Sequence, residues 1–366
     1  MKSSHPGQLL LVGVPGPRLD PETAALYRDV QPGGFILFGR NIESAAQLRR
    51  LMDDLRDLSE IEPILTIDQE GGRVSRLKLV GNEPPNAQQL RAKGEVSLIE
   101  RHGMITARLL RMFGFNLDLC PVLDLSFDDE ADNSLRGRCY GTTVEEVCRN
   151  AGAFNRALRA GGIRSCGKHF PGYAAAGLDP HHDLPVIPRT RAELEQAELA
   201  VFRRFAPDVD SMMVCHAAYP ALDPSGIPAS LSAPILRGLL LEEMGFAGLV
   251  MTDDLDMGAI LNGYSLEGSV GGAIRAGNHL AMICHRIPVL REALAVLEGL
   301  PASVLDPALE RVADWKTKLS PPEPWDEAEF RRRDAEVWDL RVAVLGAERA
   351  AQRSPEDGKR SPVEIY

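Results

Sequence analysis

The chain has 366 residues, of which 44% are hydrophobic and 25% charged, so it can bury a substantial core in one large or two average domains. Its formal net charge of -11 argues against nucleic acid and anionic membranes as partners, because both bind basic surfaces. No apolar run approaches the about 20 residues that span a bilayer, and the run Leu9–Val14 is too short for a secretory signal.

Apolar runs of strand length alternate with segments of helical periodicity along most of the chain. The expected strands are Leu9–Val14, Gly34–Phe38, Ile64–Asp68, Phe115–Leu125, Ile163–His169, Met212–Ala217, Leu249–Asp253 and Leu280–Cys284. The clearest helical patterns are Ala45–Leu58, Val144–Ala160, Ala192–Phe205 and Ile235–Met244, and capping boxes at Thr143 and Thr190 mark two helix starts. Continuous apolar strands between amphipathic helices predict a parallel sheet covered by helices, and eight of them fit an α/β fold of the (β/α)8 barrel type. A doubly wound sheet is the alternative, but no GxGxxG motif follows the first strand.

The pattern changes near residue 318, where a proline-rich turn ends the strand–helix alternation. We therefore expect a single catalytic barrel over residues 1–318 and a linker with an external helix over 319–350. The polar stretch 351–366 has the composition of a disordered tail. The six cysteines lack metal-ligand spacing, and we expect a cytoplasmic protein with reduced thiols and neither a metal nor a cofactor.

Polar residues that can take part in chemistry end four of the expected strands. They are Asp68 on the third strand, Lys168 and His169 on the fifth, His216 on the sixth, and Asp253 and Asp254 on the seventh. In a barrel these strand ends converge on one face, which is where active sites are built. The pattern therefore predicts an active site at this face.

A long loop after the fifth strand carries four ionisable groups, Asp179, His181, His182 and Asp183. A loop of this length inside a compact domain is typically functional or disordered, and this cluster favours function. Asp179-Pro-His181 sets a carboxylate beside an imidazole, which fixes the tautomer and raises the basicity of the ring. Local spacing does not choose between the two histidines.

Asp253 is the leading nucleophile candidate, because a carboxylate at a barrel rim can form an ester with an electrophilic carbon such as a sugar anomeric centre. Aspartate also caps helices readily, and we assign that role to Asp254. Lys168 and His169 can donate hydrogen bonds to a ligand, although Lys168 is also a candidate Schiff-base lysine of an aldolase-like barrel. Asp68 and Arg138 are either substrate clamps or a structural ion pair at the rim.

The segment from Lys168 to His181 reads Lys-His-Phe-Pro-Gly-Tyr-Ala-x4-Asp-Pro-His. It resembles, with identical spacing, the signature Lys-His-Phe-Pro-Gly-His-Gly-x4-Asp-Ser-His of glycoside hydrolase family 3 β-N-acetylhexosaminidases of bacterial cell-wall recycling. Further similar motifs follow in family order over roughly residues 8–290. They are Gly34-Phe-Ile-Leu-Phe-Gly-Arg-Asn41, Ile67-Asp-Gln-Glu-Gly-Gly-Arg-Val74, Pro121-Val-Leu-Asp124, Arg138-Cys-Tyr-Gly141, Pro220-Ala-Leu-Asp223 and Gly245-Phe-Ala-Gly-Leu-Val-Met-Thr-Asp-Asp-Leu-Asp-Met257.

The resemblance implies an exo-acting, retaining enzyme that removes terminal N-acetylglucosamine from muropeptide fragments through a covalent glycosyl-enzyme. It implies that Asp253 is the nucleophile and that Asp179 and His181 form a dyad whose histidine is the general acid and base. The residues implied to hold the sugar are Asp68, Arg138, Lys168 and His169. A histidine in place of the usual second carboxylate is neutral after losing its proton, so phosphorolysis is an alternative to hydrolysis.

The chain departs from the family pattern at several positions near this site. Tyr173 stands where the family has histidine; it can still donate a hydrogen bond to substrate, but it is bulkier. Pro180 separates the dyad residues and biases Asp179 towards an extended conformation. The loop before Arg138 is one residue shorter than the family pattern, which leaves Arg136 as an alternative clamp.

Three other functions compete with this interpretation. A family 3 β-glucosidase or xylosidase shares the barrel but usually takes its acid/base from a second domain, for which this chain is too short. A non-catalytic muropeptide-binding protein would need neither Asp253 nor the dyad. A metal-dependent hydrolase would use His169, His181 and His216, which do not form an HxH motif on one strand.

Overall fold

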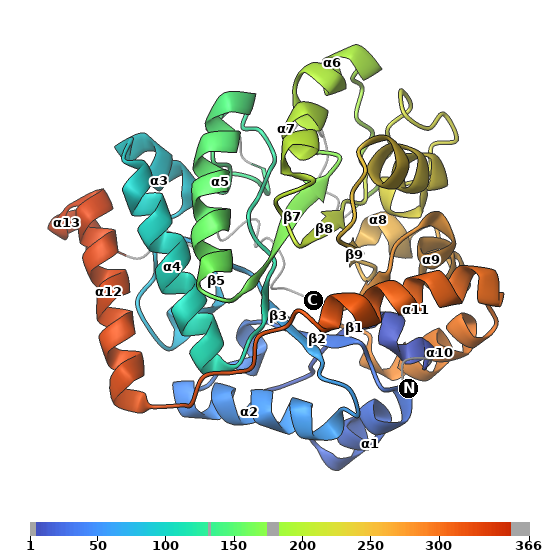
Figure 1. Cartoon of the computed structure of the whole chain (residues 1–366), viewed down its shortest axis with the longest axis horizontal. Helices are drawn as coiled ribbons and strands as arrows, with labels where there is room; N and C mark the ends of the chain where they lie inside the picture. Colours follow the sequence, from blue (N-terminus) through green and yellow to red (C-terminus); the bar gives the residue numbers. More distant parts are fainter. Residues whose placement is uncertain (1–4, 131–132, 174–182, 353–366) are drawn as a thin grey trace.

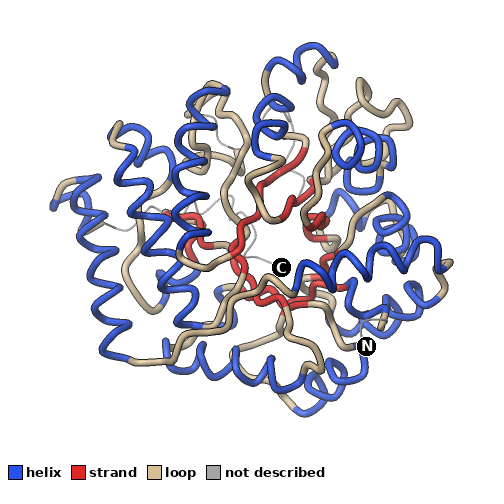
Figure 2. Tube along the Cα trace, viewed as in Figure 1, coloured by secondary structure: helices blue, strands red, loops and turns tan. Residues whose placement is uncertain are grey.

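The computed structural model describes residues 5–130, 133–173 and 183–352. Eight parallel strands close into a barrel in the order β1-β10-β9-β8-β7-β6-β3-β2, and helices surround it (Figures 1 and 2). The barrel strands are β1 Leu10–Gly13, β2 Gly34–Leu37, β3 Ile64–Ile67, β6 Leu117–Asp118, β7 Arg164–Phe170, β8 Ser211–Val214, β9 Leu249–Asp254 and β10 Leu280–Ile283. Each lies within or overlaps one of the eight predicted apolar runs. The predicted (β/α)8 fold is therefore confirmed.

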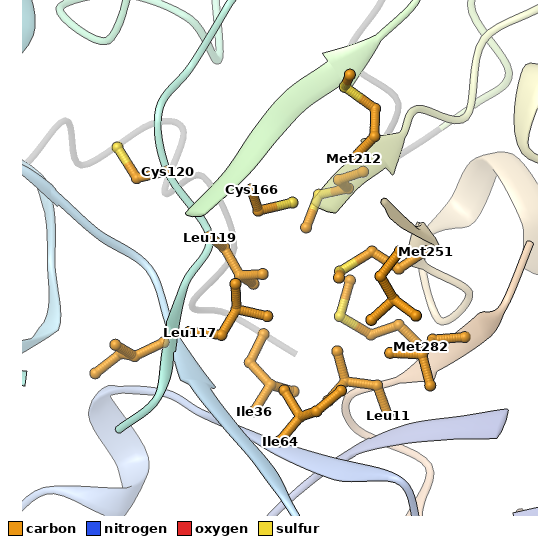
Figure 3. Packing of buried hydrophobic residues seen from close by; sticks show 14 of the residues in the cluster. Leu11, Ile36, Ile64, Leu117, Leu119, Cys120, Cys166, Met212, Met251 and Met282 are labelled. Carbon is orange, nitrogen blue, oxygen red and sulfur yellow. The ribbon is translucent and has the colours of Figure 1, made fainter. Parts of the chain in front are cut away.

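The interior of the barrel is filled by apolar side chains from its strands. Figure 3 shows Leu11, Ile36, Leu119, Met251 and Met282 crowding the central space, and all five are at most 2% exposed. The strands are buried on both faces, which explains why they read as continuous apolar runs in the sequence. The filled interior leaves only the C-terminal ends of the strands open to a ligand.

The helices that cover the barrel are α1 Pro21–Val30, α2 Ala45–Leu58, α3 Ala87–Lys93, α4 Val96–Phe113, α5 Val144–Ala160, α6 Arg191–Gln196, α7 Glu198–Phe205, α8 Gly258–Leu261, α9 Gly272–Ala276, α10 Leu290–Glu298 and α11 Ala302–Lys316. Two π-helical segments span Pro234–Glu243 and Glu267–Gly271. Short 3-10 turns occupy Pro6–Leu9, Gly39–Asn41, Arg76–Leu79, Ala229–Leu231 and Ile287–Val289. A small hairpin of β4 Gln69–Gly71 and β5 Val74–Ser75 extends from the end of β3.

The predicted helix bounds agree with the structure for some helices and disagree for others. The bounds predicted for α2 and α5 agree with the structure residue for residue. Thr143 and Thr190 both accept hydrogen bonds from the backbone of the residue three positions on. The full capping box forms only at Thr190, because the Glu146 side chain accepts from the backbone of Thr142 rather than of Thr143. The pattern over 192–205 is wrong as one helix, because Ala197 leaves helical geometry (φ -124°, ψ -93°) and divides it into α6 and α7.

Two further helices follow the barrel, α12 Glu327–Leu345 and α13 Ala347–Ala350. Figure 1 shows α12 on the outside of α4, and Phe330 of α12 packs edge-on against Phe113 of α4 with ring centroids 5.4 Å apart. α12 lies within residues 319–350, the range for which the sequence predicts a linker and an external helix. Residues 353–366 lie outside the described residues. In the described part of the chain, no helix is long and apolar enough to cross a membrane.

Candidate active site

A cavity opens at the C-terminal ends of the barrel strands and encloses about 650 Å³, part of it open to solvent. Six of the predicted site residues line it: Asp68, Arg138, Lys168, His169, Tyr173 and Asp253. These residues are up to 185 positions apart along the chain (253 − 68 = 185), and the parallel strands bring them to one face. The two remaining predicted residues, Asp179 and His181, lie outside the described residues.

Lys168, at the end of β7, is the centre of a buried ionic network. Its Nζ lies 2.6 Å from Asp68 Oδ1 and 2.6 Å from Glu70 Oε1. Glu70 also accepts two hydrogen bonds from Arg138, from Nε and Nη2, each 2.8 Å long. A carboxylate that bridges a lysine and an arginine fixes the direction of both cations, and hence the donors that they present to the cavity.

The turn that presents Glu70 depends on glycine. Gly71 and Gly72 follow it with φ of 112° and 56°, a region that L side chains rarely adopt. A Cβ on Gly71 would also lie 2.4 Å from the carbonyl oxygen of Pro85. The Glu-Gly-Gly sequence is therefore required by the tight hairpin of β4 and β5.

The network holds its members in their charged forms. Burial alone would lower the pKa of Lys168, but the neighbouring Asp68 and Glu70 carboxylates outweigh it and raise that pKa. Burial alone would raise the pKa of Glu70, but Arg138 and Lys168 hold it well below its usual range. A Schiff-base lysine needs a neutral amine, so this arrangement disfavours the aldolase alternative.

His169 is oriented by Asp124, which lies in the segment between β6 and α5. Its Nδ1 is 2.7 Å from Asp124 Oδ2, and its backbone N–H donates to the same oxygen at 3.0 Å. The other carboxylate oxygen, Oδ1, accepts from the backbone N–H of Tyr173 at 2.9 Å. Donation from Nδ1 leaves Nε2 of His169 directed towards the cavity side, 3.5 Å from Arg138 Nη2.

Tyr173 closes one wall of the cavity and is 6% exposed. Its ring packs edge-on against His169 with centroids 4.8 Å apart, and its hydroxyl is 3.1 Å from Ser134 Oγ. Burial raises the pKa of this hydroxyl above its usual value. Tyr173 therefore presents mainly a neutral ring edge to the cavity.

Asp253 lies near the end of β9, half-buried, and lines the same cavity. One carboxylate oxygen, Oδ1, accepts from the backbone N–H of Asp254 at 2.8 Å. The prediction that Asp254 caps the following helix is wrong, because Met257 is the residue before α8. Asp254 Oδ1 instead accepts from the backbone of Asp256 at 3.0 Å and of Cys284 at 3.2 Å, which ties β9 to β10. Asp254 is thus a structural support for the strand end that carries Asp253.

His216 and Arg136 are predicted alternatives that the structure assigns to other contacts. His216 is fully buried, with Nδ1 2.7 Å from Ser230 Oγ and Nε2 2.9 Å from the carbonyl of Asp254. Arg136 pairs at 3.2 Å with Glu130 on the surface, whereas Arg138 reaches the cavity. Within the described ranges, no group of three or more His, Cys, Asp or Glu side chains is arranged to hold a metal ion.

Sequence reasoning missed the two carboxylates that orient the site. Glu70 and Asp124 both belong to motifs that we quoted, Asp-Gln-Glu-Gly-Gly and Pro-Val-Leu-Asp, but no role was assigned to either. The available signal was their position, because Glu70 stands two residues after Asp68 and Asp124 stands near the end of the predicted strand Phe115–Leu125. Their partners could not be read from the sequence, since each binds a group that is distant along the chain.

Comparison with known proteins adds independent information. A model of the glycosyl hydrolase family 3 N-terminal domain matches residues 3–314. A β-hexosaminidase of Vibrio cholerae is 36% identical over 304 residues, which cover 82% of this chain and 88% of that protein. One from Pseudomonas aeruginosa is 33% identical and covers 80% and 86%. A solved family 3 β-N-acetylglucosaminidase from Paenibacillus sp. superposes with a TM-score of 0.84 at 30% identity, over 94% of this chain and 69% of that one.

Proposed function

The chain belongs to glycosyl hydrolase family 3 and is a glycoside hydrolase of the β-hexosaminidase kind, and from this premise we propose a retaining, exo-acting β-N-acetylglucosaminidase. The observation that carries the proposal is the shared cavity, which Asp253 lines together with Lys168, Arg138 and Asp68 of the charged network. The Asp253 carboxylate can attack an anomeric carbon, and the charged network can bind sugar hydroxyl groups. The first step is therefore covalent catalysis.

In that step a carboxylate oxygen of Asp253 bonds to the anomeric carbon as the bond from this carbon to the leaving oxygen breaks. The leaving oxygen takes a proton from His181, which Asp179 orients. In the second step His181 takes a proton from water, and the water oxygen replaces Asp253 at the anomeric carbon. Two displacements at one carbon return the original β configuration.

Asp68, Lys168, Arg138 and His169 hold the non-reducing sugar. Lys168 and Arg138 donate hydrogen bonds, while Asp68 accepts them, so both kinds of partner for a hydroxyl group are available. The ion pairs hold these groups in place before substrate arrives, which lowers the cost of orienting the sugar. Tyr173 shapes the subsite with its ring.

The substrate that we propose is a cell-wall muropeptide fragment, N-acetylglucosaminyl-β-1,4-linked N-acetylmuramic acid or its anhydro form, with or without peptide. This part of the proposal rests on the resemblance of the motifs from Lys168 to His181. A β-glucosidase, a phosphorylase and a non-catalytic muropeptide-binding protein are the alternatives that the following experiment distinguishes.

The experiment measures turnover of p-nitrophenyl β-N-acetylglucosaminide, the matching β-glucoside and the N-acetylglucosaminyl–anhydro-N-acetylmuramic acid disaccharide. Asp253→Ala is expected to lower kcat at least about 1,000-fold on every substrate. His181→Ala is expected to cost about 100-fold or more on the disaccharide and less on the activated aryl glycoside, because the first step of the aryl glycoside needs almost no proton donation while its second step still uses His181 as the base. His182→Ala, the matched control, keeps activity.

Covalent attachment is tested with a fluorinated N-acetylglucosaminyl fluoride, which slows the second step. We expect the sugar on the peptide that contains Asp253, detected by mass spectrometry. Preference for the β-glucoside, release of N-acetylglucosamine 1-phosphate in phosphate buffer, or tight muropeptide binding without turnover would each replace the proposal by the corresponding alternative. Turnover unaffected by Asp253→Ala would refute the mechanism.

A further inference from the structure

Asp118, at the end of β6, carries a completely buried carboxyl group behind the ionic network. Its Oδ1 accepts the backbone N–H of Gln69 at 3.0 Å. Its Oδ2 has no hydrogen-bond partner among the described residues. Gln69 stands between Asp68 and Glu70, so this one hydrogen bond anchors the segment that carries both carboxylates of the network.

The surroundings of Asp118 offer no spare positive charge. Asp68 and Glu70 face it from the β3–β4 side and Lys168 from β7, and the ammonium of Lys168 already contacts both of those carboxylates at 2.6 Å. The other titratable groups facing it are neutral, because burial raises the pKa of each. They are the thiols of Cys120 and Cys166 and the hydroxyl of Tyr140. The nearby arginines are engaged as well, Arg138 with Glu70 at 2.8 Å and Arg76 with Asp68 at 3.4 Å. An ionised Asp118 would therefore compete with Asp68 and Glu70 for Lys168, the cation that faces it.

We propose that Asp118 is a positioning residue that works as a neutral carboxylic acid, anchoring Gln69 while leaving Lys168 committed to Asp68 and Glu70. The inference rests on the proposed sugar-binding role of that network. A carboxylic acid accepts the Gln69 hydrogen bond through one oxygen and adds no charge. The carboxylate would also accept that bond but would compete for the ammonium.

The pH dependence follows from the charge. Burial, opposed by the Gln69 hydrogen bond and by Lys168, raises the pKa of Asp118 to about 8. Below this pH the acid is neutral and the network is intact. Above it the new carboxylate attracts Lys168 away from Asp68 and Glu70, so the sugar is held less well. We expect KM to rise through about pH 8 while kcat changes less.

The test uses p-nitrophenyl β-N-acetylglucosaminide, because its leaving group makes the first step insensitive to the protonation of His181, and the pH dependence that His181 gives to the second step is common to the wild type and both variants. The pH profiles of kcat and KM are compared for the wild-type enzyme, Asp118→Asn and Asp118→Leu. Asp118→Asn keeps an acceptor for Gln69 but cannot ionise, so its alkaline rise in KM should disappear. Asp118→Leu removes the acceptor and should raise KM at every pH.

A spectroscopic measurement reads the protonation state without relying on turnover. Infrared difference spectra of the wild-type enzyme across about pH 8 should contain the C=O band of a carboxylic acid that is lost on ionisation. Glu198, whose buried carboxyl has a pKa raised to about 7 by burial, is the other source of such a band. The infrared measurement is therefore made in the Glu198→Gln variant, from which the Glu198 band is absent. This variant still carries Asp118, so its spectra can be recorded even if Asp118→Asn does not fold.

A band that persists in Glu198→Gln and is absent from Asp118→Asn, together with loss of the alkaline rise in KM, supports the inference. An identical alkaline rise in wild type and Asp118→Asn, or no acid band in Glu198→Gln, overturns it and leaves the proposed function intact. Absence of hydrolysis at every pH overturns the proposed function and with it the positioning role. The infrared band tells these two failures apart, because it records the protonation of Asp118 independently.

Discussion

Two lysines are buried at opposite ends of the same barrel, and their charge states differ. Lys168, at the C-terminal end of β7, is 2% exposed, and two carboxylates at 2.6 Å raise its pKa. Lys316, in α11, is 8% exposed and contacts Gln8 Oε1 at 2.7 Å, before the start of β1. Burial, partly opposed by the charge of Glu62, lowers its pKa to about 7.

The difference shows that the barrel interior does not favour charge by itself. A buried ammonium is retained only where carboxylates accompany it into the protein, because the desolvation cost is otherwise uncompensated. In this chain Asp68 and Glu70, the carboxylates that compensate Lys168, lie at the C-terminal ends of the strands. At the other end, burial lowers the pKa of Lys316 to about 7, so its amine loses its proton near neutral pH.

The sharpest test of this comparison is to remove each ammonium by the same substitution. Lys168→Met leaves Asp68 and Glu70 buried without their cation, and we expect a loss of about 3–5 kcal/mol in unfolding free energy. Activity on the aryl N-acetylglucosaminide should be lost with it. Lys316→Met at alkaline pH removes only a neutral amine and one hydrogen bond, so the expected cost is about 1 kcal/mol. Chemical denaturation of both variants measures the change in unfolding free energy, and equal losses for Lys168→Met and Lys316→Met would contradict the comparison.

The second prediction concerns the pH dependence of stability. The folded-state pKa of Lys316 is about 7, below the ordinary lysine value of 10.5, so the unfolded chain binds more protons between these values. Stability therefore rises with pH in this window, and the cost of burying the charge remains in full below about pH 7. The unfolding free energy of wild type relative to Lys316→Met should increase by about 3–4 kcal/mol from pH 7 to 10. A flat difference would show that Lys316 stays charged.

The third prediction tests the contribution of Glu70 to the network while Lys168 is kept. Glu70→Gln removes the carboxylate that orients Arg138 and Lys168, so we expect kcat/KM to fall about 100-fold, mainly through KM. The control is Glu198→Gln, which alters another buried glutamate that pairs with Arg189 at 3.2 Å and does not line the cavity. Steady-state kinetics of both variants should show the loss in the first only. A similar fall in kcat/KM in both variants would show that the effect is not specific to Glu70.

The smallest expected effect is at the wall of the cavity. Tyr173→Phe keeps the ring against His169 and removes the hydroxyl that contacts Ser134 Oγ at 3.1 Å. We expect a loss of about 1 kcal/mol in unfolding free energy and a change of less than about tenfold in kcat/KM. A larger fall in kcat/KM would show that the hydroxyl itself donates to the sugar.

The barrel was predictable because its signals are local. Each strand is a short apolar run, each major helix has a regular period, and parallel strands carry their C-terminal residues to one face. Asp68, Lys168, His169 and Asp253 could therefore be assigned to one site before their distances were known. The family motifs extended this assignment to Arg138.

The contacts that set the chemistry depend on distant partners. The sequence offers Lys168 and Lys316 as equivalent side chains, and only the closed barrel sets two carboxylates beside the first and an amide beside the second. The same holds for Asp124 under His169 and for Asp118 behind Gln69. Local pattern determines which segment a residue belongs to, whereas its charge depends on burial and on neighbours supplied by other strands.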